Sequence, residues 1–85
     1  MPSPPRVVLY GRPDCHLCDQ ARAELRALRS HGLSFEIEEI DIESDDQLLS
    51  RFLERIPVIE LDGEIVSELR LDADGFRARL DTLSA

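Results

Sequence analysis

Apolar positions follow two different periods along the first third of the chain. Residues 6–10 form a short apolar run rich in β-branched side chains, and turn-forming residues follow it, which predicts a β-strand. Because this run is apolar without interruption, we expect burial on both of its faces, as in a central strand. Residues 15–29 carry apolar residues at spacings of four, four and three, which predicts one buried helix face. The residues of this face are Leu17, Ala21, Leu25 and Leu28.

Local signals mark the ends of this helix and the strand that follows it. Asp14 is the expected N-cap of the helix, and Gly32 is expected to end it. Residues 33–37 then alternate like a strand with one buried face. Since the next two isoleucines have the opposite phase, the strand either bulges near residues 38–39 or ends there.

A second helix is predicted after this strand. Ser44 is its expected N-cap, and Gln47 three residues later completes a capping box. The helix must end before Ile56-Pro57, because a residue that precedes proline disfavours the helical conformation. We expect four apolar residues of this helix to face inward, namely Leu48, Leu49, Phe52 and Leu53.

The last third of the chain predicts a hairpin and a final helix. Residues 57–61 and 64–68 predict two antiparallel strands, because the Asp-Gly between them is a strong signal for a tight turn. Asp72 is the expected cap of a helix whose inner face carries Phe76, Leu80 and Leu83. The order is therefore βαβαββα, in which a right-handed crossover makes the first two strands parallel. We predict one α/β domain over residues 1–85, a mixed four-stranded sheet flanked by three helices.

Composition and charge narrow the classes of partner. The chain has 18 acidic and 10 basic residues and a net charge of −8, so we expect neither nucleic acid nor a membrane surface as partner. Its hydrophobic content of 42% is typical of a globular protein, and no apolar run approaches the ~18 residues of a membrane span. The proline-rich residues 1–5 lack the pattern of a secretory signal and are expected to form a flexible lead-in. We therefore expect a cytoplasmic protein.

Cys15 and Cys18 form a CxxC motif between a predicted buried strand and a helix N-terminus. The free N–H groups and the dipole of that helix end favour negative charge, so a thiol there ionises more easily. Cys18 faces the same side of the helix and is expected to lie deeper than Cys15. Cys15 can then attack a substrate disulfide, and Cys18 can resolve the resulting mixed disulfide. This context predicts a dithiol–disulfide oxidoreductase.

Two other interpretations of the CxxC motif stay open, and a third, a zinc site within one chain, is not expected. A structural zinc site takes four ligands, and the remaining candidates are His16 and His31, so we expect no metal site within one chain. An iron–sulfur cluster or a metal ion held between two chains would make the protein a non-enzymatic carrier. An inert cysteine pair would make it an adapter in which the cysteines are incidental.

Residues 9–18, Leu-Tyr-Gly-Arg-Pro-Asp-Cys-His-Leu-Cys, resemble the active-site segment of glutaredoxins. In that family a strand that ends in tyrosine precedes a basic residue and the CxxC, and Tyr10, Arg12 and Cys15 match these positions. Residues 56–58, Ile-Pro-Val, resemble the family's Val-Pro segment. The chain is thus similar over nearly its whole length to glutaredoxin-like members of the thioredoxin superfamily, which implies the thioredoxin fold.

The resemblance implies a role for each matching residue. The two cysteines would be the attacking and the resolving cysteine, in chain order. Pro57 would be cis and face them, and the backbone of Ile56 would pair with the backbone of a bound substrate. Arg12 would stabilise the thiolate or hold a substrate carboxylate. Tyr10 would line the same groove, or would only pack at the end of its strand.

The chain departs from the family pattern in two places. His16 and Leu17 stand between the cysteines, where typical glutaredoxins have Pro-Tyr. After the fourth strand, Ser67-Glu68 and Arg70-Leu71 replace the Gly-Gly and the paired acids that hold the γ-glutamyl end of glutathione. Glu68 would repel a carboxylate of glutathione, which puts glutathione dependence in doubt. The pattern is closer to that of short bacterial glutaredoxin-like proteins.

These features define the expected partners. The substrate would be a disulfide-containing protein or a small thiol compound, and glutathione or a thioredoxin-reductase-type enzyme would supply electrons. We expect a monomer without a resident cofactor. Arg55, beside Ile56, would either meet an anionic group of the substrate or remain a solvated helix end.

Overall fold

Four strands form a single mixed sheet. The strands are β1 (Arg6–Gly11), β2 (Glu36–Asp41), β3 (Val58–Leu61) and β4 (Glu64–Glu68), and the helices are α1 (His16–Ser30), α2 (Asp46–Phe52) and α3 (Ala73–Ser84). The sheet order is β2-β1-β3-β4, in which β1 pairs in parallel with β2 and antiparallel with β3, and β4 runs antiparallel to β3. This confirms the predicted α/β topology. The computed structural model describes residues 4–84, so residues 1–3 of the predicted lead-in and residue 85 lie outside it.

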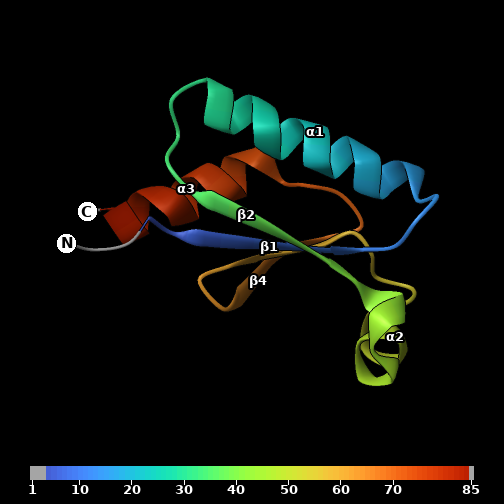
Figure 1. The fold of residues 1–85 in the computed structure, drawn as a ribbon. Coiled ribbons are helices and arrows are strands. Elements are labelled where there is room, and N and C mark those ends of the chain that lie inside the picture. Colours follow the sequence, from blue (N-terminus) through green and yellow to red (C-terminus); the bar gives the residue numbers. More distant parts are fainter. Residues whose placement is uncertain (1–3, 85) are drawn as a thin grey trace.

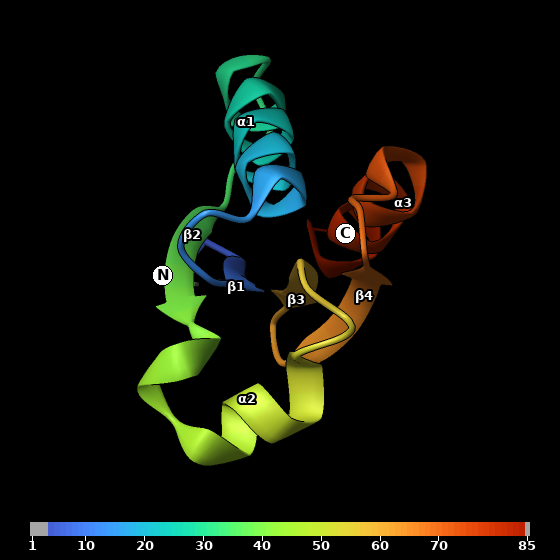
Figure 2. The same cartoon turned by 90° about the vertical axis from the view of Figure 1, so that its right-hand side faces the viewer.

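The helices cover the two faces of the sheet unequally. Helices α1 and α3 lie side by side on one face, whereas α2 lies on the opposite face at one end of the sheet (Figures 1 and 2). Val7 and Leu9 of β1 point to the first face and are fully buried, while Val8 and Tyr10 point to the second and are half-buried. β1 is central, as predicted, but its expected burial on both faces is wrong, because α2 is too short to cover the second face.

Two clusters of buried side chains hold these layers together. The larger cluster lies between the sheet and helices α1 and α3, and each fully buried aliphatic side chain stabilises it by about 1.5–3 kcal/mol. Its members are Val7, Leu9, Ala21, Leu25, Phe35, Ile59, Leu61, Leu71, Phe76 and Leu80. The smaller cluster joins the start of α1 to α2 and β3, and its members are Cys18, Ile42, Phe52, Ile56 and Val58. The smaller cluster therefore places α2 and the segment before β3 against the CxxC motif.

Strand β2 is regular, so both predicted alternatives for it are wrong. Its pairing with β1 runs without a break from Glu36 to Asp41, with no bulge near residues 38–39. Ile37 packs against the larger cluster, and Ile40 points to the opposite face, where it lines an open hollow beside β1. The phase of the isoleucines changes because this strand places apolar residues on both faces. The sheet's one irregularity in pairing among the described residues lies between β3 and β4.

Several predicted turns and caps are confirmed. Gly32 follows α1 with a φ of 104°, in the left-handed region that glycine adopts without strain. Asp62 and Gly63 have φ values of 48° and 88° and form the hairpin turn between β3 and β4. At the start of α3, the carboxylate of Asp72 accepts a hydrogen bond from the N–H of Gly75 at 3.1 Å.

The cap of α2 lies one residue later than predicted. Asp45 is extended, and its carboxylate accepts hydrogen bonds from the N–H groups of Gln47 at 2.8 Å and Leu48 at 3.1 Å. Ser44 instead ends a 3₁₀ turn that follows β2, and its hydroxyl donates to the carbonyl oxygen of Asp41 at 2.6 Å. The predicted capping box is therefore wrong, because the 3₁₀ turn takes up the serine.

Three leucines that were expected on buried helix faces are exposed. Leu17, Leu53 and Leu83 are 46%, 45% and 37% exposed, and each stands in the first or last turn of its helix or just beyond it. In α1, the buried face begins with Cys18 and continues with Ala21, so a cysteine occupies the place that the periodicity gave to Leu17. Among residues 4–84, no helix has the length and apolar character needed to cross a bilayer.

Candidate active site

The turn between β1 and α1 places Cys15 at the N-terminus of the helix. Asp14 has a φ of 60° and Cys15 is extended, with φ −102° and ψ 106°. Cys15 is therefore the N-cap of α1, and the prediction of Asp14 as N-cap is wrong, because its left-handed conformation places it in the preceding turn. The N–H of Cys18 donates to the sulfur of Cys15 at 3.2 Å. This hydrogen bond and the helix dipole both favour negative charge on that sulfur.

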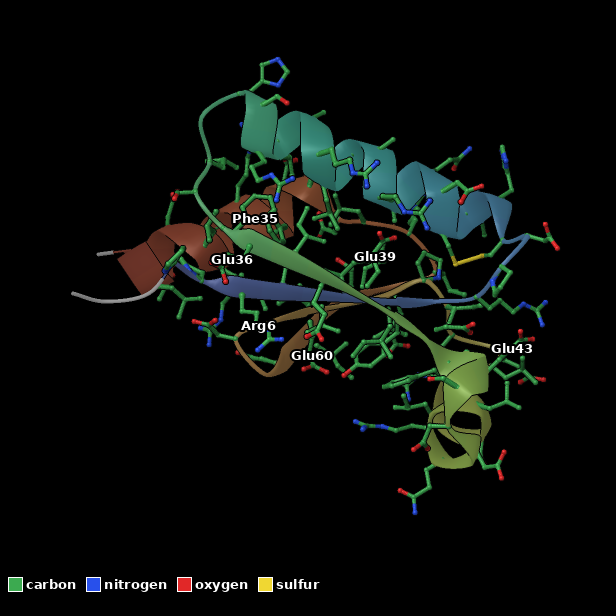
Figure 3. The ribbon with its side chains drawn as sticks, viewed as in Figure 1. Arg6, Phe35, Glu36, Glu39, Glu43 and Glu60 are labelled. Atoms are coloured by element: carbon green, nitrogen blue, oxygen red, sulfur yellow. A yellow bond between two sulfur atoms is a disulfide. The ribbon has the colours of Figure 1, made fainter. Side chains whose placement is uncertain are left out.

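Cys15 and Cys18 form a disulfide, with Cα atoms 5.2 Å apart. Figure 3 shows it as a yellow bond beneath the first turn of α1, at one end of the molecule. Cys15 is half-buried, whereas Cys18 is 1% exposed and belongs to the smaller cluster. An incoming group can therefore approach Cys15 from solvent. Cys18 is shielded from solvent and is accessible only to Cys15.

Gly11, the last residue of β1, gives the inner cysteine its space. A Cβ at this position would lie 2.9 Å from the sulfur and 3.2 Å from the Cβ of Cys18. The bare backbone of Gly11 therefore lets the sulfur approach the strand. Sequence reasoning treated Gly11 only as a turn residue. Its position directly after an apolar strand and four residues before the CxxC is the signal that would have indicated close backbone approach.

The segment before β3 borders the disulfide from a second side. The Ile56–Pro57 peptide bond is cis, as the resemblance implied, and Pro57 is buried. Ile56 packs in the same cluster as Cys18, and Cys15 contacts the edge of that cluster. The N–H of Ile56 donates to the carbonyl oxygen of Phe52 at 3.1 Å. Any pairing of Ile56 with a substrate backbone would therefore use its carbonyl oxygen.

Arg55 and Glu68 form an ion pair beside this segment. The guanidinium of Arg55 donates to both carboxylate oxygens of Glu68, with Nε to Oε1 at 3.0 Å. These hydrogen bonds lower the pKa of Glu68 and raise that of Arg55. Arg55 was expected either to meet a substrate anion or to remain solvated, and instead it neutralises Glu68. The positive charge of Arg55 therefore offsets the repulsion that Glu68 was expected to exert on a substrate anion.

Arg12 and Tyr10, the other two predicted site residues, lie in different places. Arg12 is exposed and lines a hollow of about 330 Å³, together with Asp14, Cys18 and residues at the end of β2. Tyr10 lies on the opposite face of the sheet, where its ring packs on Phe52 with centroids 4.8 Å apart. Burial, and then a hydrogen bond to a neighbouring glutamate, raise the pKa of Tyr10. Tyr10 does not line the hollow beside Arg12; it packs at the end of its strand, against the same smaller cluster that Cys15 contacts.

The two histidines lie apart from each other. His16 is exposed in the first turn of α1, with its Nε2 3.2 Å from the side-chain nitrogen of Gln20. His31 is the C-cap of the same helix. Within the part of the chain that the structure describes, no three histidine, cysteine or carboxylate residues come together in a group able to hold a metal ion.

The fold and the CxxC disulfide at the start of α1 place this chain in the thioredoxin superfamily. The family described as "Glutaredoxin-like domain (DUF836)" matches residues 6–81, so the chain belongs to the glutaredoxin-like family. It is 32% identical over 82 residues to "Glutaredoxin-like protein YDR286C homolog" from Dictyostelium discoideum, a match that covers 91% of this chain and 76% of that protein.

Solved structures agree with this assignment. Protein Ne2328 from Nitrosomonas europaea has a TM-score of 0.80 and 32% identity, over 93% of this chain and 94% of that chain. The protein XcR50 from X. campestris has a TM-score of 0.67 and 35% identity, over 89% and 96% of the two chains. Oxidised thioredoxin from Plasmodium falciparum, at 10% identity and a TM-score of 0.60 over 95% and 82%, shares the fold. The predicted family and thioredoxin fold are therefore confirmed.

Proposed function

We propose that this protein is a dithiol–disulfide oxidoreductase in which Cys15 attacks and Cys18 resolves. The observation that carries this proposal is the asymmetry of the disulfide at the start of α1. Cys15 is half-buried and its sulfur accepts a backbone hydrogen bond at the helix N-terminus, whereas Cys18 is buried. A sulfur that is both reachable and stabilised as an anion is the better nucleophile and the better leaving group.

The reaction consists of two exchanges at sulfur. In the reduced protein, the Cys15 thiolate attacks a substrate disulfide, forms a mixed disulfide and releases the first substrate thiolate, which takes up a proton. The Cys18 thiol then loses its proton and attacks the Cys15 sulfur, which releases the second substrate thiolate. The substrate gains two electrons, and the protein ends in the oxidised form with the Cys15–Cys18 bond. A thiol or dithiol donor returns it to the reduced form.

Two observations argue against a strong dependence on glutathione as this donor. Glu68 stands where typical glutaredoxins have a glycine, and Arg55 already pairs with it. Ser67, at the other glycine position, is buried, and its hydroxyl accepts a hydrogen bond from the N–H of Asp72 at 3.1 Å. We therefore favour a dithiol donor, such as a thioredoxin-reductase-type enzyme. We also place the protein in the cytoplasm, as a monomer without a resident cofactor.

Steady-state reduction of insulin or hydroxyethyl disulfide tests the proposal. We expect Cys15→Ser to lower the rate to that of the uncatalysed reaction, because no other thiol in the chain is accessible. His16→Ala, next to the cysteine but without a sulfur, is the matched control and is expected to remain active. Full activity in Cys15→Ser would contradict the proposal. Stoichiometric metal or visible colour in anaerobically purified protein would instead support a carrier of metal or clusters.

A further inference from the structure

Helix α2 leaves part of the second face of the sheet uncovered. In Figure 1 it lies at one end of the sheet, and no other helix of residues 4–84 lies on that side. The uncovered part forms an open hollow of about 680 Å³, and Figure 3 shows Arg6 and Glu60 on this side of the sheet. Its floor consists of three half-buried side chains, Val8, Tyr10 and Ile40. An apolar floor that remains partly in contact with water is a surface that a second element can cover.

Carboxylates outnumber guanidinium groups around this hollow. Strand pairing places Glu38 and Glu60 on the two sides of Val8, in the neighbouring strands β2 and β3. Asp62, at the hairpin turn, lines the hollow as well. Arg6 is the one basic residue among the described residues that line it, and it pairs with Glu38. Three carboxylates against one guanidinium leave the hollow with a net charge of −2.

Glu60 is the residue that points to a cationic partner. It is half-buried on an inner strand of the sheet, where its cross-strand neighbours are Val8 of β1 and Ile65 of β4. A carboxylate in such apolar surroundings is stabilised by a paired cation, because partial burial removes it from water. Within residues 4–84 no arginine or histidine forms an ion pair with Glu60, and its hydrogen-bond partner is the neutral phenol of Tyr10. An incoming ammonium or guanidinium group would supply the missing positive charge.

The dimensions and the charge of this face favour a basic helix over a second copy of the chain. The six residues of β1 span about 20 Å, and an α-helix of about 14 residues has the same length. Helices already cover the other face of the same sheet (Figure 2). A second copy would bring its own Glu38, Glu60 and Asp62 against these residues, and each chain has a net charge of −8, so like charges disfavour it.

We propose that this face of the sheet docks a basic amphipathic helix of a partner protein. The apolar side of that helix covers Val8, Tyr10 and Ile40, and its lysine or arginine side chains pair with Glu60 and Asp62. This interaction goes beyond the proposed function, because no step of the exchange reaction uses these residues. The partner is therefore defined by an apolar stripe bordered by positive charges.

Titration with synthetic peptides of about 14 residues tests this proposal. The first peptide contains only leucine and lysine, with the leucines at helical spacings of three and four. The second has the same composition in an order without an apolar stripe, and the third has glutamate in place of lysine. Tyr10 is the single tyrosine of a chain without tryptophan, so its fluorescence reports the binding of these peptides. We expect the first peptide to bind about tenfold more tightly than either of the others.

Zero-length crosslinking locates the bound peptide. The chain contains no lysine, so a carbodiimide joins lysines of the peptide to carboxylates of the protein without lysine crosslinks inside the chain. Mass spectrometry of the wild type crosslinked to the first peptide is expected to find Glu38, Glu60 and Asp62 as the main sites.

Three variants separate the charge from the apolar contact. Glu60→Gln removes the unpaired charge and keeps the shape of the side chain, so we expect binding about fivefold weaker. Glu24→Gln is the matched control, since Glu24 is exposed on α1, which covers the other face of the sheet. Its affinity is expected to equal that of the wild type. Val8→Thr keeps a β-branched residue in the strand and is expected to weaken binding about threefold through lost apolar contact.

Several results would overturn this docking surface while leaving the exchange reaction intact. These are equal affinities for the three peptides, crosslinks that fall mainly on carboxylates of α1 or α3, and an unchanged affinity in Glu60→Gln. Sedimentation equilibrium adds one further outcome: a wild-type dimer that Val8→Thr weakens would show that a second copy covers the face, against the proposal.

Discussion

Replacing Gly11 with alanine puts a methyl group against the inner sulfur of the disulfide. The new Cβ would lie 2.9 Å from the sulfur of Cys18, whereas non-bonded heavy atoms reach their optimum near 3.5–4.0 Å. The Cys18 sulfur has no free rotation to escape, because it is bonded to Cys15 and its residue lies in α1. Either the first turn of α1 or the end of β1 must therefore move.

The expected loss is that of overpacking a core, about 1–3 kcal/mol. For a domain of this size each kcal/mol lowers Tm by about 4–8 °C. The backbone at Gly11 does not adopt a positive φ, so alanine brings no backbone strain there. Without the collision, alanine in a strand would stabilise the protein by about 0.5–1 kcal/mol relative to glycine. A loss of stability in Gly11→Ala therefore indicates a steric role of Gly11, whereas a gain in stability indicates that it has none.

Urea denaturation of the oxidised protein, followed by circular dichroism, measures this effect. The same substitution is then made in a Cys18→Ala background, with reductant present to keep Cys15 a free thiol. Removal of the sulfur leaves only the milder contact with the Cβ at 3.2 Å, so most of the penalty is expected to disappear. A Gly11→Ala protein as stable as the wild type, or an equal penalty in both backgrounds, would refute the reasoning.

Three further predictions concern caps and charges. Asp45→Ala is expected to lower stability by about 0.5–2 kcal/mol in urea denaturation, more than Ser44→Ala, because Asp45 is the N-cap of α2. In Arg55→Gln, carbon-detected NMR titration should show the pKa of Glu68 rising towards its ordinary value. Because the ion pair lowers the pKa of Glu68 in the native protein, it stabilises the wild type at neutral pH, and this stabilisation disappears as the pH falls through the lowered pKa. The stability difference between the wild type and Arg55→Gln is therefore expected at neutral pH and is lost in acid. The single tyrosine, Tyr10, is expected to ionise at higher pH in the native protein than in guanidinium chloride by ultraviolet titration.

Periodicity predicted the elements well because most of them bury one face. It failed where a helix ends, since the edge of an apolar stripe is covered only if a neighbouring element reaches it. In α1, Leu17 and Cys18 were equally available to begin the buried face, and the contact with Gly11 and α2 selects the cysteine. For β2, the isoleucines changed phase because the open second face of the sheet accepts Ile40, which a strand pattern alone does not reveal.

The chemistry of the candidate site was predictable in part. The CxxC at a strand–helix junction gave the position of the cysteines, and the resemblance gave the cis bond before Pro57. The charge environment of Glu68 could not be predicted from its sequence neighbours. It depends on Arg55, 13 positions away, which reaches Glu68 only after α2 and β4 have packed. The left-handed φ of Leu69 carried no signal in the sequence, since it arises where the chain leaves β4. Such properties arise from tertiary contacts and not from local pattern.

The central claim, that Cys15 is the nucleophile and Cys18 resolves, is tested most directly by trapping the intermediate. Reduced Cys18→Ser protein is mixed with a peptide disulfide, and the products are mapped by mass spectrometry without reductant. We expect one peptide per chain, attached to Cys15 and released by dithiothreitol, whereas Cys15→Ser should leave the buried Cys18 unmodified. Absence of the adduct in Cys18→Ser, or equal labelling of Cys18 in Cys15→Ser, would contradict the mechanism.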